Sequence, residues 1–254
     1  MNKEILYAHQ VTKIYGLESS NPVTALKNID LKMYEGDFIC VMGPSGSGKS
    51  TFINVLSTID TPTKGNVYIN GTEIRTMSEN EIARFRYQNL GFIFQEFNLL
   101  DSLTIYENIA VPLTLANQSL KDIEIRVQEI VKKLHIESLL EKYPSECSGG
   151  QRQKVAIARA LVTKPKLIVA DEPTGNLDSH HSHELLELFH QLNEEGISVL
   201  MVTHDSMIAS YSKKLIYIKD GEIAETLTRG EMDQKEYFYK IVDINSLESQ
   251  KWFQ

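Results

Sequence analysis

Short apolar runs separated by turn residues make up the first part of the chain. The runs occupy residues 5–15, 26–33, 38–42 and 65–71. The last of them ends in Asn70-Gly71, a dipeptide that favours a tight hairpin turn. We expect these runs to be strands of an antiparallel layer, with a helix at residues 49–59 after the third strand. A further apolar strand is expected at residues 90–94.

The pattern becomes helical between Thr104 and Leu140. Apolar residues there recur at intervals of three and four, as on one face of a helix. They are Ile123, Val127, Ile130, Val131 and Leu134. Because this block lies between Gln95 and Cys147, it predicts a helical subdomain inserted into the strand-rich part of the chain.

Helical and strand patterns alternate after residue 150. We expect helices at residues 151–162 and 179–192, and strands at residues 167–170, 197–202 and 215–218. Such alternation is typical of an α/β fold with a largely parallel sheet. The final stretch, residues 234–254, mixes aromatic and charged residues, and we expect a packed helix there.

Composition and charge limit the number of domains and the kinds of partner that the chain can have. The 254 residues fit one large α/β domain or two small ones, and 42% hydrophobic content is enough for a substantial core. A net charge of −8 argues against nucleic acid or anionic lipid as a partner. Cys40 and Cys147 lie far apart and outside metal-binding spacing, as expected for reduced thiols of a cytosolic protein. No secretory signal is expected, and no apolar run approaches the roughly 18 residues of a membrane span, so another polypeptide would supply any spans.

The first chemical signal is a glycine-rich segment between the strand at 38–42 and the helix that follows. It matches the phosphate-binding pattern G-x-x-x-x-G-K-[ST]. Small residues let backbone N–H groups surround a phosphate chain, and the helix N-terminus adds positive potential. We expect Lys49 to contact the β- and γ-phosphates, Ser50 to ligate Mg²⁺ and Thr51 to contact the α-phosphate. The whole predicted segment is Gly43, Pro44, Ser45, Gly46, Ser47, Gly48, Lys49, Ser50 and Thr51.

Polar residues follow three of the other predicted strands. Asp171 and Glu172 end an apolar strand, and the ends of parallel strands form the ligand-binding edge of an open α/β sheet. We expect Asp171 to hold Mg²⁺ and Glu172 to polarise the attacking water. His204 follows the strand at 197–202 and could orient that water. Gln95 follows the strand at 90–94, and its amide could reach both Mg²⁺ and the water.

Together these residues resemble those of the ATP-binding-cassette ATPases, and nearly the whole chain takes part in the resemblance. Gln95 matches the family's Q-loop and His204 its switch histidine. Cys147–Gln151 matches the signature motif and Asn176–Asp178 the D-loop. Tyr15 falls where the family places an aromatic that stacks on adenine, although an ordinary edge-strand aromatic is the alternative.

The resemblance implies the fold and the assembly. The fold would be a P-loop NTPase cassette spanning residues 1–254, with an antiparallel β layer and an inserted helical subdomain. Its core would comprise residues 1–95 and 151–232, the helical subdomain residues 96–150 and the tail residues 233–254. Two copies would enclose two ATP molecules, each held by the phosphate loop of one copy and the signature motif of the other. The residues expected at that second half-site are Ser148, Gly150, Gln151 and Asp178.

Cys147 and a cluster of histidines depart from the simplest pattern. Cys147 stands where the signature motif usually has leucine; a small apolar residue can fill the same packing position, with redox sensing as the alternative. His180, His181 and His183 form a cluster, but their helix has an apolar face, so we expect a surface helix rather than a metal site.

Narrower resemblance points to one branch of the family. The segments 57–65 and 91–100 are similar to ATPases whose permeases have the MacB/FtsX-type fold. The segments 202–205, 209–211 and 216–222 are similar to ATPases of bacitracin and lantibiotic resistance. This implies a peripheral protein at the cytoplasmic face of the bacterial membrane, a separate permease and, through it, a sensor histidine kinase.

The permease would contact the segment after Gln95. Its apolar residues are Phe97, Leu99, Leu100 and Leu103, with core packing as the alternative for any one of them. A lipoprotein-release or cell-division ATPase is the alternative within transport. The signature motif argues against a P-loop metabolic kinase, and the length argues against chromosome, repair and translation-factor cassettes.

Overall fold

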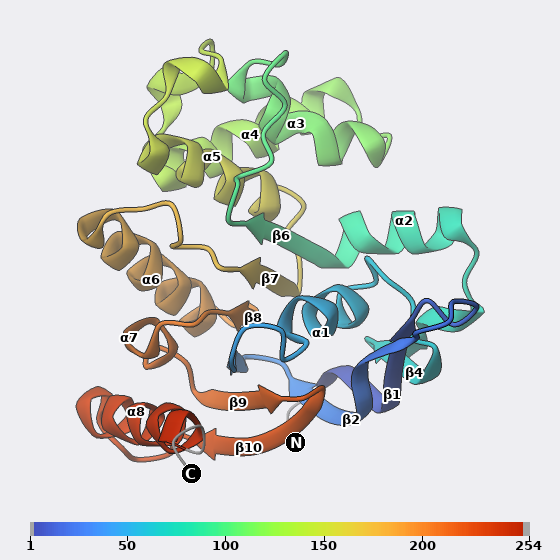
Figure 1. Cartoon of the computed structure of the whole chain (residues 1–254). Coiled ribbons are helices and arrows are strands. Elements are labelled where there is room, and N and C mark those ends of the chain that lie inside the picture. Colours follow the sequence, from blue (N-terminus) through green and yellow to red (C-terminus); the bar gives the residue numbers. More distant parts are fainter. Residues whose placement is uncertain (1–2, 251–254) are drawn as a thin grey trace. The chain divides into compact units, whose positions relative to one another are not determined.

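The computed structural model describes the backbone of residues 3–250 and the side chains of residues 3–246. The chain forms two compact units (Figure 1). The first comprises Met1–Met77 and Leu186–Gln254, and the second comprises Ser78–Leu185. Each unit is described by itself.

The first unit contains a four-stranded antiparallel sheet in the order β2-β1-β4-β5. Its strands are β1 (Glu4–Tyr15), β2 (Val23–Tyr34), β4 (Lys64–Ile69) and β5 (Thr72–Glu73). A short 3-10 helix, η1 (Ile74–Thr76), follows β5. The predicted strands at 5–15, 26–33 and 65–71 are therefore confirmed, with shifts of a few residues at their ends. The Asn70-Gly71 turn joins β4 to β5, as its sequence predicts.

The first unit also contains a group of parallel strands. β3 (Phe38–Met42) pairs in parallel with both β8 (Ser198–Val202) and β9 (Lys214–Lys219), and β10 (Glu222–Thr228) runs antiparallel to β9. The expectation that residues 38–42 join the antiparallel layer was wrong. All five residues of β3 are buried, and a strand covered on both faces is characteristic of parallel pairing. β10 was not predicted, because its sequence alternates polar residues with few apolar ones.

Three helices complete the first unit. They are α1 (Lys49–Leu56), α7 (Ser206–Ala209) and α8 (Gln234–Gln250). α1 ends before residue 59 because the Ser57 hydroxyl donates to the backbone carbonyl of Ile53 and Thr58 adopts a left-handed backbone conformation, with φ of 65°. The helix predicted for residues 234–254 is confirmed as far as Gln250 by α8, whose Tyr237 is fully buried, and residues 251–254 lie outside the described part of the chain.

The second unit combines two parallel strands with four helices that lie wholly within it. β6 (Leu90–Phe94) pairs with β7 (Leu167–Asp171), and the helices are α2 (Glu79–Asn89), α3 (Ile105–Leu115), α4 (Leu120–Leu134) and α5 (Gly149–Leu161). Two 3-10 turns, η2 (Glu137–Leu139) and η3 (Pro144–Glu146), lie before α5. The boundary between the units falls within α6 (Ser179–Glu194). The helical pattern between residues 104 and 140 thus corresponds to α3, α4 and η2.

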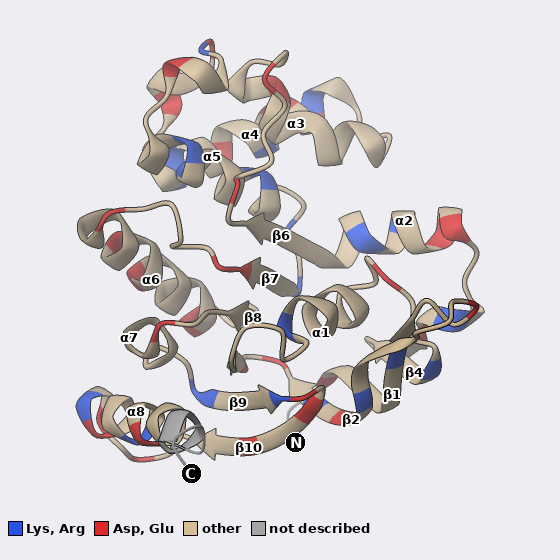
Figure 2. Ribbon diagram, viewed as in Figure 1, with Lys and Arg blue, Asp and Glu red and all other residues tan. Residues whose placement is uncertain are grey.

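α2 was not predicted, because none of its residues is buried and its sequence therefore lacks an apolar periodicity. The usable signal is its capping box, in which Ser78 and Glu81 satisfy each other's backbone N–H groups. Acidic residues occupy its first turn and Arg86 its last, an arrangement that complements the helix dipole (Figure 2).

Candidate functional site

The phosphate loop of the first unit can be built only with glycine at two of its positions. Gly43 follows β3 with φ of 151°, and a Cβ there would lie 2.0 Å from the carbonyl oxygen of Ile218. Gly48 has φ of 104°, and its Cβ would lie 2.5 Å from the carbonyl oxygen of Ala25. Both backbones are packed too closely for a side chain, so the tight turn and the start of α1 depend on these glycines.

The side chains of the loop form a set of donors suited to a phosphate chain. Lys49 Nζ donates to the carbonyl oxygens of Gly43 and Pro44, each at 2.9 Å, which holds the ammonium group across the loop. The Ser47 hydroxyl is buried and is among the described side-chain atoms without a hydrogen-bond partner. A cavity of about 440 Å³ is lined by Lys49, Ser50 and Thr51 on one side and by residues 23–25 on another. This set of donors and the volume of the cavity fit a nucleoside triphosphate.

His204 lies at the same edge of the parallel strands as the phosphate loop. Val41 of β3 is aligned with Val202 of β8, and Thr203 N donates to the carbonyl oxygen of Val41 at 3.2 Å. Gly43 and His204 therefore both follow the carboxyl ends of neighbouring strands, and His204 is exposed. The structure brings these two predicted site segments together.

Tyr15 is the last residue of β1 and is 43% exposed. Its hydroxyl donates to Asp60 at 2.8 Å. Burial raises the pKa of Tyr15 above its ordinary value, Thr51 works to lower it, and Asp60 works to raise it. The phenol is therefore protonated at neutral pH and lies beside the phosphate loop.

Gln95 and the acidic pair come together in the second unit. Phe94 of β6 is aligned with Asp171 of β7, so Gln95 and Glu172 follow the ends of adjacent parallel strands. The loop after Glu172 packs on Gln95: a Cβ on Gly175 would lie 2.8 Å from Gln95 Nε2. Asn176 also donates its side-chain amide to the carbonyl oxygen of Gln95 at 2.9 Å. The pairing of β6 with β7 thus places three of the predicted catalytic and metal-binding positions at one edge of the strands.

Glu172 has a left-handed backbone conformation, with φ of 46°. Such a conformation is uncommon for a side chain of this kind and is found most often where function requires it. The carbonyl oxygen of Glu172 accepts a hydrogen bond from Gly175 N at 3.0 Å, which closes the turn. The turn directs the chain away from the strand immediately after Asp171.

The loop after Gln95 is held by an arginine that sequence reasoning did not identify. Phe97 and Asn98 are both left-handed, with φ of 59° and 49°. The guanidinium of Arg159, from α5, donates to the carbonyl oxygens of both residues. Burial lowers the pKa of Arg159. α5 and the Gln95 loop are therefore tied together by one side chain.

The signature segment starts α5 with a capping box. Ser148 Oγ accepts from Gln151 N at 3.3 Å, and Gln151 Oε1 accepts from Ser148 N at 2.9 Å. The spacing of Ser148 and Gln151, three residues apart, is the sequence signal for this arrangement. Gly150 packs against the ring of His181, since a Cβ at residue 150 would lie 2.4 Å from His181 Cδ2.

Asp178 lies in the same unit, directly before α6. Its carboxylate accepts hydrogen bonds from His181 N at 2.9 Å and from His181 Nδ1 at 2.9 and 2.8 Å. These hydrogen bonds lower the pKa of Asp178. His181 therefore contacts both the predicted D-loop and the signature segment, a role that no pattern in its own sequence indicates.

A profile of the ABC transporter family matches residues 26–175. The chain belongs to the ABC transporter family. It is 49% identical over 224 residues to the ABC transporter ATP-binding protein YxdL of Bacillus subtilis (strain 168), covering 88% of this chain and 87% of YxdL. It is 44% identical over 239 residues to the bacitracin export ATP-binding protein BceA of Halalkalibacterium halodurans, covering 94% of each.

The fold of this ABC protein matches that of a solved relative. The dimeric ATP-binding cassette MJ0796 of Methanocaldococcus jannaschii, in a post-hydrolysis state with ADP and Pi, has a TM-score of 0.81 and 39% identity. The match covers 88% of this chain and 98% of that chain. The fold is an α/β P-loop cassette, as predicted. The protein is the ATPase subunit of an ABC transporter and uses ATP with Mg²⁺.

The other residues that the sequence analysis singled out differ in exposure. Cys147 is 7% exposed, and burial raises the pKa of its thiol. Phe97 is buried beneath the guanidinium of Arg152, whereas Leu100 is 48% exposed. Core packing, the alternative, thus applies to Phe97. Across residues 3–250, no helix has both the length and the apolar character that crossing a membrane requires.

Proposed function

We propose that two copies of the chain close around two ATP molecules. Each ATP would contact the phosphate loop of one copy and Ser148, Gly150, Gln151 and Asp178 of the other. The observation that supports this most strongly is the shape of the signature segment. Its capping box presents Ser148 at the N-terminus of α5, and Gly150 adds no side chain that would keep a phosphate at a distance. The solved relative MJ0796 is itself a dimer.

Within such a dimer, Glu172 polarises the attacking water, and His204 and Gln95 orient it. Tyr15 stacks on the adenine ring. Ser50, Gln95 and Asp171, as predicted from the sequence, would hold Mg²⁺. When bound, the ion would neutralise charge on the phosphate oxygens, and Lys49 and the backbone N–H groups of the loop bind and orient the phosphates.

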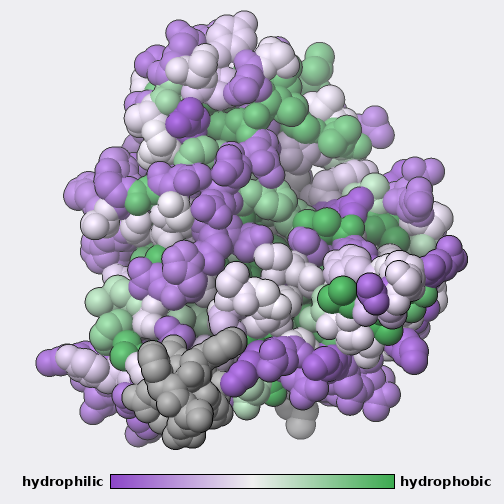
Figure 3. Space-filling model, viewed as in Figure 1, coloured by the Kyte–Doolittle hydropathy of each residue, from purple (hydrophilic) through white to green (hydrophobic). Residues whose placement is uncertain are grey.

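We further propose that the dimer drives a separate permease of the MacB/FtsX type, at the cytoplasmic face of the membrane, in resistance to cell-wall-active peptides. The support is the similarity to BceA, which extends over 94% of both chains. The permease contacts the segment after Gln95, where Leu100 is 48% exposed, and a second exposed apolar surface adds to this contact (Figure 3). This second surface gathers where α3 and α4 lie and includes Leu115, Leu120 and Ile125. A sensor histidine kinase would be linked only through the permease.

The first experiment tests the catalytic assignment with Glu172→Gln. The amide keeps the size of the side chain but removes the charge that polarises water, so ATP should bind without being hydrolysed. We expect a stable dimer with ATP in size-exclusion chromatography and ATPase activity lowered by at least 100-fold. Lys49→Ala is the matched variant, and it should lose ATP binding and the dimer together. Hydrolysis at the parental rate by Glu172→Gln would refute the assignment of the base.

The second experiment tests the physiological role. A strain that lacks this ATPase should become more sensitive to bacitracin or lantibiotics, and plasmid-borne wild type but not Glu172→Gln should restore resistance. Unchanged sensitivity with a defect in lipoprotein release or in division would replace the peptide role with that alternative. The ATPase assignment would be unaffected, because it is tested separately on the purified protein.

A further inference from the structure

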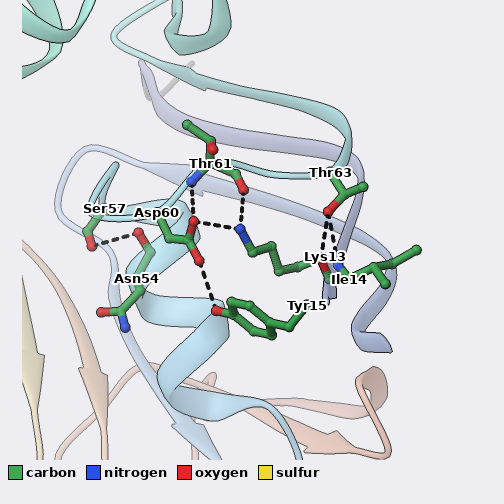
Figure 4. A network of polar contacts seen from close by, with 8 residues as sticks. All are labelled: Lys13, Ile14, Tyr15, Asn54, Ser57, Asp60, Thr61 and Thr63. Atoms are coloured by element: carbon green, nitrogen blue, oxygen red, sulfur yellow. Dashed lines mark hydrogen bonds and ion pairs between the residues drawn. The ribbon is translucent and has the colours of Figure 1, made fainter. Parts of the chain in front are cut away.

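We propose that Asp60 is a positioning residue for nucleotide binding, which fixes the ring of Tyr15 in the orientation that receives the base. The inference rests on the proposed role of Tyr15 in stacking on adenine. Asp60 lies in the loop after α1, whereas Tyr15 ends β1, so only the folded chain brings them together (Figure 4).

The carboxylate of Asp60 is the centre of a network of three donors. Tyr15 Oη donates to Oδ2 at 2.8 Å. Lys13 Nζ and the backbone N of Thr61 both donate to Oδ1, at 2.6 and 2.7 Å. Burial works to raise the pKa of Asp60, but these hydrogen bonds, that from Lys13 first, hold the pKa below its ordinary value. The carboxylate is therefore ionised at neutral pH, and the phenol of Tyr15 is its donor.

The same network holds the backbone that carries Tyr15. Lys13 Nζ also donates to the carbonyl oxygen of Thr61 at 2.9 Å, and its side chain is only 12% exposed. Ile14 N donates to Thr63 Oγ1 at 3.0 Å. The two residues of β1 that precede Tyr15 are thus attached to the loop 60–63, which also carries Asp60. The rotation of the ring about its side-chain bonds is restricted at both its backbone and its hydroxyl.

The ring is oriented without being covered. Lys13 Nζ lies 4.9 Å from the centre of the Tyr15 ring, while Tyr15 itself stays 43% exposed. Thr51 of the predicted phosphate-binding segment works to lower the pKa of Tyr15. Because Asp60 holds the hydroxyl, the exposed part of the ring is left to receive a base.

This arrangement predicts an effect on affinity that depends on the base. An aromatic side chain that must be ordered on binding weakens the affinity by about 3- to 10-fold compared with one already ordered. Asp60→Asn and Asp60→Ala should therefore raise the Kd for ATP by that factor. The Kd for inorganic triphosphate should not change, because that ligand has phosphates and no base. Both constants can be measured by isothermal titration calorimetry on the full-length protein.

The control variant is Asp30→Asn. Asp30 is a carboxylate on β2 that accepts a hydrogen bond from Gln10 N and pairs with His9. This substitution should leave both constants unchanged. Equal weakening of ATP and triphosphate by Asp60→Asn would mean that the phosphate loop has been distorted, and the inference would be overturned. Thermal unfolding of each variant establishes that it is folded.

Two variants of Tyr15 separate the inference from the function on which it rests. Tyr15→Ala should weaken ATP binding and spare triphosphate; if ATP binding does not change, the stacking role itself is wrong. If Tyr15→Ala weakens ATP binding but Asp60→Ala does not, only the positioning role of Asp60 is wrong. Tyr15→Phe keeps the ring and removes the hydroxyl, so it should match Asp60→Ala, and combining the two should add little.

Discussion

Replacing Gly150 with alanine tests how closely the signature segment packs against α6. A Cβ at residue 150 would lie 2.4 Å from Cδ2 and 2.8 Å from Nε2 of His181. Carbon atoms in contact are normally about 3.5 Å apart or more, so the ring has to move by roughly 1 Å. This movement would break the hydrogen bonds from His181 Nδ1 to Asp178.

The adjacent Gly149 provides the control. A Cβ there would meet only the carbonyl oxygen of Asn176, at 3.7 Å, which is an ordinary contact. Gly149→Ala should stabilise the protein by about 0.4–1 kcal/mol, because alanine restricts the unfolded chain more than glycine does. Gly150→Ala has the same gain, but overpacking costs about 1–3 kcal/mol and offsets it. We therefore expect Tm to rise by about 1–4 °C for Gly149→Ala and to stay level or fall for Gly150→Ala.

The assay is thermal unfolding of both variants in parallel with their ATPase activity. His181→Ala should have a more favourable effect on the Tm of Gly150→Ala than on the Tm of the parental protein, because it removes the clashing ring. The ATPase activity of Gly150→Ala should remain low in the double variant, because the added methyl group still lies where the partner's nucleotide is proposed to bind. An equal rise in Tm for both glycine variants, with no coupling to His181, would refute the packing argument.

Three other changes have expected outcomes. Cys147→Leu should keep ATPase activity, and the parental thiol should react with iodoacetamide at neutral pH only slowly until denaturant is added, because Cys147 is buried and its pKa is raised. Burial raises the pKa of Tyr237 to about 12; its contribution to stability is therefore present below the unfolded pKa of about 10 and is lost as pH rises towards 12, and Tyr237→Phe should reduce this alkaline loss in pH-dependent unfolding. Asn108→Ala removes hydrogen bonds to the backbone of Leu100, Leu103 and Thr104, so it should lower the free energy of unfolding by about 1–3 kcal/mol and speed hydrogen exchange at Leu100.

Local patterns in the sequence were sufficient to predict most of the helices and strands. The strands at 38–42 and 90–94 were predicted with their observed ends, because compact apolar runs bounded by turn residues have few alternatives. The phosphate loop was recognised because its geometry depends on glycines at set spacing. α2 was missed because its signal lies in a capping box and not in an apolar face.

Pairing between distant segments could not be predicted in the same way. The sequence of β3 is compatible with either sheet, and only its burial between β8 and β9 decides that it pairs in parallel. The hydrogen-bond partner of Tyr15 is a second example, because no pattern in the sequence of the loop that carries Asp60 predicts its contact with β1.

The sequence by itself determined the family, the ATPase chemistry and the residues expected to contact nucleotide, because these depend on residue types at short spacing. The tertiary structure alone decided which side chains hold those residues in place. Asp60 orders Tyr15, Arg159 supports the loop after Gln95, and His181 contacts both Asp178 and Gly150. The physical reason is that hydrogen bonds and close packing act between atoms that are near in space, whereas a sequence pattern records only which residues are near along the chain.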